Sequence, residues 1–190
     1  KIQLLAYLIQ QSSNCLVYTG AGISTSSGIN DYATKSTTKF GKGKKLSSHL
    51  AAQPTLAHRV VVSLYNSGFV KHWIQQNHDG LPQKAGFPQH AINEIHGAWY
   101  DPTNPVVPMT GELRDDLQND MIEWEERADL TIAIGTSMCG MNADRVFTTI
   151  SERACKYRRK EMKRTGRLIT DPWNSQPKCS DASGKFIPIG

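Results

Sequence analysis

The chain has 190 residues, of which 38% are hydrophobic and 21% charged, a composition typical of a globular protein with its own core. No apolar run approaches the roughly 20 residues that span a bilayer, so the sequence predicts no membrane partner. The formal net charge of +5 excludes a strongly acidic protein.

The first elements predicted are a helix, a strand and a glycine turn. Residues 1–11 carry apolar side chains at helical spacing, and the apolar run 15–18 predicts a buried strand. Residues 19–24 (Thr-Gly-Ala-Gly-Ile-Ser) follow directly. Such a turn is typical of a strand that passes into a short helix whose N–H groups bind a diphosphate. Taken alone, it fits a plain strand-to-helix corner equally well.

A polar segment that we expect to be a loop precedes the next helix and strand. Residues 33–53 are rich in Lys, Thr, Ser and Gly over most of their length and indicate a flexible loop. Helical periodicity resumes over 55–67, and 70–75 is predicted to be a strand. Polar residues 76–79 (Gln-Asn-His-Asp) come where that strand ends. They suit either the binding of hydroxyls and water or an Asx-capped turn.

His96, in the sequence Ile-His-Gly, is the candidate general base. The pKa of imidazole lies naturally near neutrality, which suits proton transfer from a sugar hydroxyl. A single histidine is nevertheless more often structural than catalytic, so this assignment depends on the other motifs.

The remaining elements alternate in the same way. Residues 113–128 suit an amphipathic helix, 130–134 form the clearest buried strand, and 135–137 (Gly-Thr-Ser) form a second polar turn. A helix over 142–163 and strands at 167–170 and 186–189 complete the pattern. Strands that alternate with helices predict an α/β fold, a Rossmann-like parallel sheet with helices on both faces.

Cysteines and basic residues give weaker indications. The four cysteines (Cys15, Cys139, Cys155 and Cys179) have no zinc-ribbon spacing, so we expect no metal and an intracellular location, in the nucleus or cytoplasm. Two basic groups, at 39–45 and 156–164, suit weak contact with nucleic acid or chromatin. Solvated surfaces explain them better, because aromatic residues that could stack on bases are scarce.

The three motifs together resemble those of the sirtuins, the NAD-dependent protein deacylases. Residues 20–24 with 28–32, 76–81 and 94–97 match the family's successive motifs, and 135–138 match its dinucleotide-contacting turn. The sequences of residues 54–58 and 86–88 are similar to those of the nuclear, chromatin-associated branch. The resemblance implies one NAD-binding domain over 1–190, in which 33–53 is a cofactor loop or remnant of the small lobe.

The resemblance also implies the roles of individual residues. His96 would take a proton from the ribose, and Asn77 would position ribose and water. Asp79 would hold the nicotinamide carboxamide. The cofactor-binding set that the resemblance implies comprises Gly20, Ala21, Gly22, Ile23, Asp31, Tyr32, Gln76, Asn77, Asp79, Gly135, Thr136, Ser137 and Asp171.

Several departures from the family pattern bear on activity. No cysteine lies between His96 and Gly135, and residues 98–112 form a shortened connection where the family carries its zinc module. Ala33 stands in place of an arginine that orients the cofactor. Pro108 and Thr110 fall on the strand and the aromatic position that normally receive the acyl-lysine peptide.

The resulting prediction is an NAD-dependent protein-lysine deacylase that passes the acyl group to ADP-ribose and releases nicotinamide. Its substrate partner would be an acylated protein lysine. Two alternatives stay open: an NAD hydrolase or mono-ADP-ribosyltransferase, and a catalytically degenerate protein that binds NAD or ADP-ribose. Ala33 and the missing zinc module favour the last of these.

Overall fold

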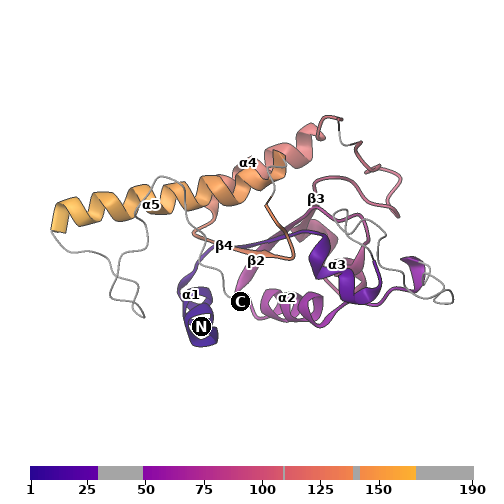
Figure 1. Cartoon of the computed structure of the whole chain (residues 1–190), viewed down its shortest axis with the longest axis horizontal. Coiled ribbons are helices and arrows are strands. Elements are labelled where there is room, and N and C mark those ends of the chain that lie inside the picture. Colours follow the sequence, from indigo (N-terminus) through magenta and orange to yellow (C-terminus); the bar gives the residue numbers. More distant parts are fainter. Residues whose placement is uncertain (30–48, 109, 139–141, 166–190) are drawn as a thin grey trace.

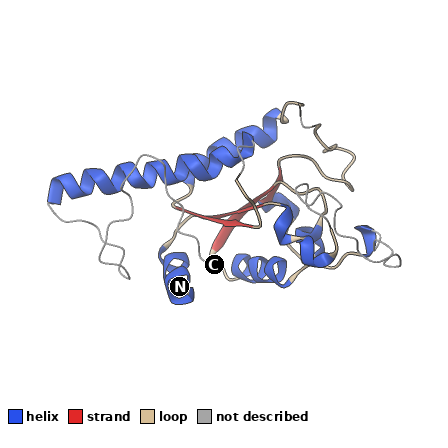
Figure 2. Cartoon of the chain, viewed as in Figure 1, coloured by secondary structure: helices blue, strands red, loops and turns tan. Residues whose placement is uncertain are grey.

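The structure is a computed structural model that describes residues 1–29, 49–108, 110–138 and 142–165. Its centre is a parallel sheet of four strands in the order β3-β2-β1-β4 (Figures 1 and 2). The strands are β1 (Cys15–Thr19), β2 (Val70–Gln75), β3 (Ile92–Glu94) and β4 (Leu130–Ile134). The α-helices are α1 (Ile2–Gln11), α2 (Leu56–Asn66), α3 (Leu81–Lys84), α4 (Asp115–Arg127) and α5 (Arg145–Thr165).

The strand order places a topological switch beside β1. The chain runs from β1 outward to β2 and β3, and then returns to add β4 on the other side of β1. In open parallel sheets, ligands bind outside the carboxyl ends of the strands at such a reversal. We therefore expect a ligand site at the turns that follow β1 and β4.

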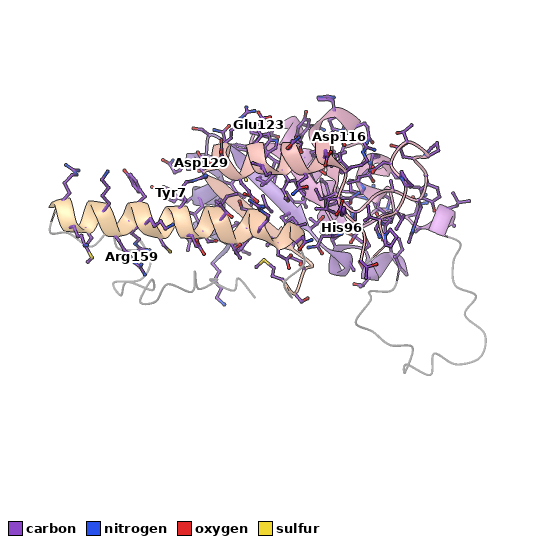
Figure 3. The ribbon with its side chains drawn as sticks, turned by 90° about the horizontal axis from the view of Figure 1, so that it is seen from above. Tyr7, His96, Asp116, Glu123, Asp129 and Arg159 are labelled. Carbon is purple, nitrogen blue, oxygen red and sulfur yellow. The ribbon has the colours of Figure 1, made fainter. Side chains whose placement is uncertain are left out.

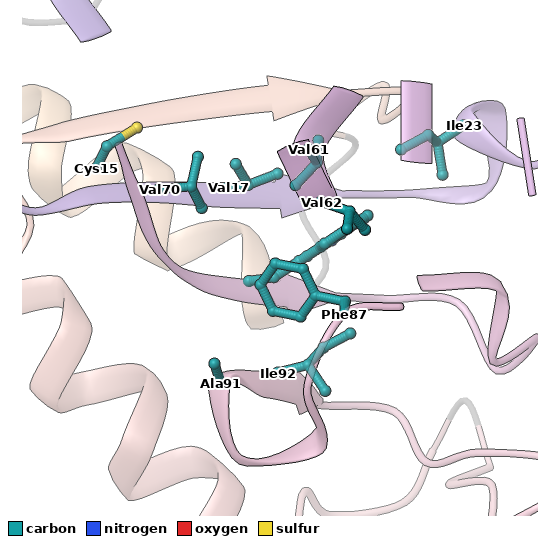
Figure 4. Close-up of a cluster of buried hydrophobic side chains, with 10 residues drawn as sticks. Cys15, Val17, Ile23, Val61, Val62, Val70, Phe87, Ala91 and Ile92 are labelled. Atoms are coloured by element: carbon teal, nitrogen blue, oxygen red, sulfur yellow. The ribbon is translucent and has the colours of Figure 1, made fainter. Parts of the chain in front are cut away.

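Two hydrophobic layers cover the sheet, one on each face. In Figure 1, α2 and α3 lie on one side and α4 and α5 on the other. The layer under α2 joins Val17 of the sheet to Val61 and Phe87 (Figure 4). It also contains Trp73 of β2, whose ring meets that of Phe87 edge to face, with the ring centroids 5.0 Å apart. The opposite layer packs Leu16, Tyr18 and Ile74 against Met121 and Trp124 of α4 and Val146 and Ile150 of α5.

The α/β fold with a parallel sheet and helices on both faces is confirmed, and so are β1, β2, β4 and the four long helices, to within about two residues at most ends. The prediction missed two short elements. Strand β3 and helix α3 were not predicted, because three and four residues are too few to show a period. The short helix predicted after β1 consists of two 3₁₀ turns, Ala21–Ile23 and Thr25–Ser27.

Strand β4, which was predicted to be buried, is more open than expected, and helix α1 buries little of its surface. Strand β4 is an edge strand among the described residues, and all five of its residues are half-buried. On α1 only Ile9 is buried, whereas Ile2 is 83% exposed. The predicted strands at 167–170 and 186–189 lie outside the described residues. None of the helices described is both long enough and apolar enough to cross a membrane.

Candidate functional site

The turns after β1 and β4 are in direct backbone contact at the switch point. A Cβ on Gly22 would lie 2.9 Å from the Cα of Gly135, and a Cβ on Gly135 would lie 2.2 Å from the Ile23 nitrogen. Gly135 also has φ +67, a conformation that favours glycine. These glycines therefore allow two loops, more than 100 residues apart in the sequence, to touch.

This contact uses part of the hydrogen-bonding capacity expected for a diphosphate. The Gly20 N–H donates to the Ile134 carbonyl at 3.1 Å, and the Gly22 N–H donates to the Gly135 carbonyl at 2.8 Å. The Ala21 N–H between them has no partner among the residues described. On the second turn, the Thr136 hydroxyl accepts from the Met138 N–H at 3.2 Å.

The polar residues after β2 form a buried hydrogen-bonded group with the first turn. The Ser24 hydroxyl donates to one oxygen of Asp79 at 2.6 Å, and the Leu81 N–H donates to the other at 2.9 Å. The Asn77 amide donates to the Gly20 carbonyl at 3.2 Å and to the Ser24 hydroxyl at 3.1 Å. The donors of Asn77 are thus engaged, while its side-chain oxygen accepts no hydrogen bond from the described residues.

Gln76 links the sheet to the start of α5. Its side-chain amide donates to the Tyr18 hydroxyl and, at 3.0 Å, to a carboxylate oxygen of Asp144. The Tyr18 hydroxyl donates to the same oxygen at 2.7 Å. Burial, followed by the bond to Asp144, raises the pKa of Tyr18, so this hydroxyl stays protonated. The Gln76 side chain therefore has a structural role beside any role towards a cofactor.

His96 lies at the end of β3, half-buried, beside this group (Figure 3). Its Nδ1 is 3.3 Å from the Gln76 carbonyl oxygen. A carbonyl oxygen only accepts, so Nδ1 carries the proton and Nε2 carries the lone pair. Burial lowers the pKa of His96, and nearby His78 adds to this, against opposing effects of the Gln76 carbonyl and Asp144. A neutral imidazole with a free lone pair at Nε2 has the protonation state of a general base.

Glu94 is a buried carboxyl two residues before His96, at the start of the motif 94–97, to which the sequence analysis assigned no role. It is 3% exposed and accepts a hydrogen bond from the Gln75 side chain at 2.9 Å and one from Gln89 at 3.4 Å. Burial raises its pKa despite these donors and Gln83. The side-chain oxygens of Gln75 and Gln83 are buried without a partner. The cluster is thus rich in acceptors and short of donors.

We expect Glu94→Gln to stabilise the protein at pH 8 by about 2–4 °C in Tm, the shift produced by about 1 kcal/mol in a domain of this size. The new amide supplies donors for the unpaired glutamine oxygens and removes a buried charge. Because folding raises the carboxyl pKa above 4.5, the contribution of the wild-type carboxyl is fully present below that pH and is lost as the pH rises. The two proteins should therefore have the same Tm near pH 4.

Thermal unfolding from pH 4 to pH 8 measures this effect. Glu123→Gln is the matched control, since Glu123 is an exposed carboxylate on α4 that pairs with Arg127. It should leave the pH dependence unchanged. A lower Tm for Glu94→Gln at pH 8 would mean instead that the glutamines require an ionised carboxylate.

The connection after His96 closes into a short loop through its own hydrogen bonds. The Ala98 N–H donates to the Asn104 carbonyl at 2.8 Å, and the Asn104 side chain donates to the Glu94 carbonyl at 3.1 Å. A Cβ on Gly97 would lie 2.3 Å from the Pro105 carbonyl oxygen. The described residues contain no group of three or more His, Cys, Asp or Glu side chains that could hold a metal ion.

This loop also packs over the polar motif that follows β2. The Trp99 N–H donates to the His78 carbonyl at 2.9 Å, and Nδ1 of His78 is 2.8 Å from the Gly97 carbonyl oxygen. Tyr100 lies 3.6 Å from the position of a Cβ on Gly80. Sequence reasoning missed this packing, because nothing in the motifs pairs the two loops.

A cavity of about 580 Å³ opens on the α4/α5 side of the site. Its lining includes the carboxylates of Glu112, Asp115 and Asp144. Asp144 also belongs to the hydrogen-bonded group of Tyr18 and Gln76, and the Gln76 carbonyl contacts His96. A single residue, Gln76, therefore connects the lining of the cavity to the candidate base.

Most of the predicted site residues lie in these turns. Gly20, Gly22, Gly135 and Thr136 meet at the switch point, while Asn77, Asp79, Gln76 and His96 follow β2 and β3. Ile23 differs, since its side chain is 4% exposed and belongs to the core under α2; only its backbone faces the second turn. Ser137 is exposed. Asp31, Tyr32 and Asp171 lie outside the described residues.

The sequence has curated relatives, although no model of a known protein family matches it. Human NAD-dependent protein deacetylase sirtuin-7 is 38% identical over 104 residues, covering 53% of this chain and 26% of the relative. Fruit-fly (Drosophila melanogaster) Sirt6 is 40% identical over 105 residues, covering 53% and 33%. Arabidopsis thaliana SRT1 is 31% identical over 183 residues, covering 73% and 38%. The chain thus spans between about a quarter and two fifths of these relatives.

Solved structures share its fold. A complex of Sir2 with the inhibitor EX-527, 2′-O-acetyl-ADP-ribose and deacetylated p53 peptide matches with a TM-score of 0.64 at 25% identity, covering 78% of this chain and 81% of that one. A Sir2–p53 peptide–NAD⁺ structure matches with a TM-score of 0.65 at 24% identity, covering 79% and 82%. The four-stranded parallel sheet with its covering helices is the Sir2 catalytic fold.

Proposed function

This chain belongs to the sirtuin family, and we propose that it is an NAD-dependent protein-lysine deacylase that transfers the acyl group to ADP-ribose and releases nicotinamide. Its relatives are named as NAD-dependent deacetylases. One observation carries the proposal: the half-buried His96 has its lone pair at Nε2 and lies beside Gln76, next to the Asn77–Asp79 group and the two glycine turns.

The turns fit a dinucleotide at several points. The Ala21 N–H has no partner among the described residues, and the neighbouring Thr136 and Ser137 supply further polar groups for phosphates and ribose. Gly20 and Gly22 make the contact between the turns possible, because a side chain at either position would overlap the second turn. Their contribution to cofactor binding is therefore steric. Asp31, Tyr32 and Asp171 stay in the proposed cofactor-binding set on the family resemblance alone.

The residues after β2 suit the nicotinamide end. Each Asp79 oxygen accepts one hydrogen bond and keeps a lone pair for a carboxamide N–H. Asn77 presents its oxygen to a ribose hydroxyl or a water molecule. Bound NAD would supply an electrophilic ribose carbon when nicotinamide leaves. Nε2 of His96 would then take the proton of a ribose hydroxyl, and burial keeps the imidazole neutral for that purpose.

The cavity supports an acylated lysine peptide as the second substrate. Its lining includes Glu112 and Asp115, whose negative charge would favour a peptide with basic side chains beside the acyl-lysine. The chain covers less than two fifths of the length of these relatives. The substrate, the chromatin contact and the nuclear location are therefore inferred from the family. The domain organisation is also inferred from the family. It is a single domain over residues 1–190, in which 33–53 form a cofactor loop and 98–112 a shortened connection.

A second candidate is NAD cleavage without an acyl-lysine, by hydrolysis or by ADP-ribosyl transfer. Pro108 supports it, because proline has no N–H to donate to a peptide strand. A third, a protein that binds NAD or ADP-ribose without turnover, is supported by Ala33 in place of the family's arginine.

Nicotinamide release from NAD, with and without an acetyl-lysine peptide, separates the three candidates. We expect release that depends on the peptide, together with formation of the deacetylated peptide, as seen by mass spectrometry. Equal release without peptide would favour NAD cleavage. NAD binding by calorimetry without any release would overturn the deacylase proposal in favour of a binding protein.

A further inference from the structure

The first half of helix α5 packs against the rest of the domain, and Cys155, near the middle of the helix, is disulfide-bonded. Val146 and Ile150 are buried against α4 and β1, and Ile150 is the last buried residue of the helix among those described. Arg145 pairs with the buried Glu125 at 2.7 Å, and Arg153 donates to the Glu125 and Ala128 carbonyls at the end of α4. Beyond Arg153, α5 extends past the edge of the sheet (Figures 1 and 3).

The extending half carries as much net charge as the whole chain. Residues 156–164 contain six basic residues and one glutamate, a net charge of +5, equal to the formal net charge of all 190 residues. Four of the cations, Lys156, Arg159, Lys160 and Lys163, stand at positions i, i+3, i+4 and i+7. That spacing puts them on one face of a helix. We call them the basic stripe.

The stripe has little of the compensation of an ordinary solvated face, since among its four residues only Lys156 has an acidic residue, Glu152, at helical spacing. All four side chains are exposed, and within the described structure none forms an ion pair. Arg159, Lys160 and Lys163 have no acidic residue three or four positions away. Like charges at this spacing repel by a few tenths of a kcal/mol per pair. By contrast, the outer face of α4 carries the pair Glu123–Arg127.

We propose that the basic stripe on the extending half of α5 binds the phosphate backbone of duplex DNA without sequence preference. A helix about 10–12 Å across matches the major groove, about 12 Å wide, and the stripe runs for about 10 Å at 1.5 Å per residue. The major groove of A-form RNA is too narrow for such a helix. Single strands are bound mainly by stacking, for which the extending half offers one aromatic side chain, Tyr157, 64% exposed.

The absence of sequence preference follows from the residues around the stripe. Residues 153–165 contain no Asn or Gln, the side chains that read adenine edges. Lysine ammonium groups bind phosphates as point charges, which position a protein without specifying bases. The binding energy should therefore come mostly from released counterions and depend steeply on salt.

The test is fluorescence anisotropy of a labelled 20-base-pair duplex of mixed sequence, titrated with the whole chain at 50–200 mM salt. We expect a Kd of about 1–100 µM, the range of non-specific binding. The logarithm of the association constant should fall with log salt at a slope of about −3.6, the value for four phosphate contacts. The double variant Arg159→Gln/Lys163→Gln should lower the affinity at least about tenfold. It should also reduce the magnitude of that slope by about half.

A matched variant separates the stripe from general charge. Arg59→Gln/Lys71→Gln removes the same two charges from exposed positions on α2 and β2 and should leave DNA affinity nearly unchanged. An equal loss in both variants would overturn the proposal, and so would no binding at 50 mM salt. Equal or tighter binding of single-stranded DNA, duplex RNA, or polyglutamate of matched charge would also overturn it. NAD binding should be the same in all variants, so failure here is distinguishable from failure of the proposed function.

Discussion

Replacing His96 with alanine should lower the rate of nicotinamide release and deacetylation by about 10²–10⁴-fold, the usual contribution of a positioned general base, while NAD still binds. The imidazole holds its Nδ1 against the Gln76 carbonyl, so its loss removes the proton acceptor at Nε2 and leaves the glycine turns in place. Turnover with the peptide and calorimetric NAD affinity, measured on the same preparation, check the two halves of this expectation.

His90→Ala is the control for this substitution. His90 is an exposed imidazole whose ring lies 3.4 Å from the Tyr65 hydroxyl, away from the turns, so its loss should change neither quantity. Full turnover in His96→Ala would remove His96 from the mechanism. Loss of NAD binding together with turnover would instead make it a residue that shapes the pocket.

The pH profile tests the same residue by another route. Burial lowers the pKa of His96, so the neutral base persists to a lower pH than in an exposed histidine. Turnover should therefore fall on the acid side with a midpoint below 6.5, the ordinary value. NMR titration of the His96 imidazole gives the same midpoint without relying on activity. A midpoint above 6.5 would mean that the Gln76 carbonyl and Asp144 together outweigh burial.

The sheet was predictable because its strands are short apolar runs with polar turns at their carboxyl ends. Apolar runs of this length between polar turns are typical of strands in a parallel sheet, so β1, β2 and β4 could be located from composition, although β4 proves to be a half-buried edge strand. Strand β3 has only three residues, and its middle residue, Asn93, donates to the Leu117 carbonyl at 2.7 Å and to Asp120 at 2.6 Å. Long-range partners of this kind leave no periodic trace in the sequence.

The site was predictable at the level of motifs and not at the level of contacts. The motifs indicated that His96, Asn77 and the glycine turns share one edge of the sheet. They did not indicate that Gly22 and Gly135 touch, or that Gln76 holds Tyr18 and Asp144. Glu94 and Trp99 were overlooked for the same reason, because their partners come from other loops. Contacts between loops depend on tertiary packing, which local patterns do not encode.

The contact between the two turns makes Gly135→Ala the substitution with the largest expected effect on the fold of the site. Its methyl group would lie 2.2 Å from the Ile23 nitrogen and 2.7 Å from the Gly22 carbonyl carbon, both backbone atoms that cannot rotate away. The turns must separate, which breaks the bond from the Gly22 N–H to the Gly135 carbonyl. We expect a loss of about 4 kcal/mol or more in unfolding free energy, and no measurable NAD affinity in any protein that folds.

Gly68→Ala supplies the control that isolates this contact. Gly68 has φ +77, close to the +67 of Gly135, but a Cβ there meets nothing within 4 Å. Both variants therefore bear the cost of about 1–2 kcal/mol for an L-residue in the left-handed region, and only Gly135→Ala adds the overlap between the turns. Urea unfolding of both proteins gives the difference directly. If the two lose the same stability and both bind NAD, the turns are not held together at the switch point, and the proposed dinucleotide site loses its structural basis.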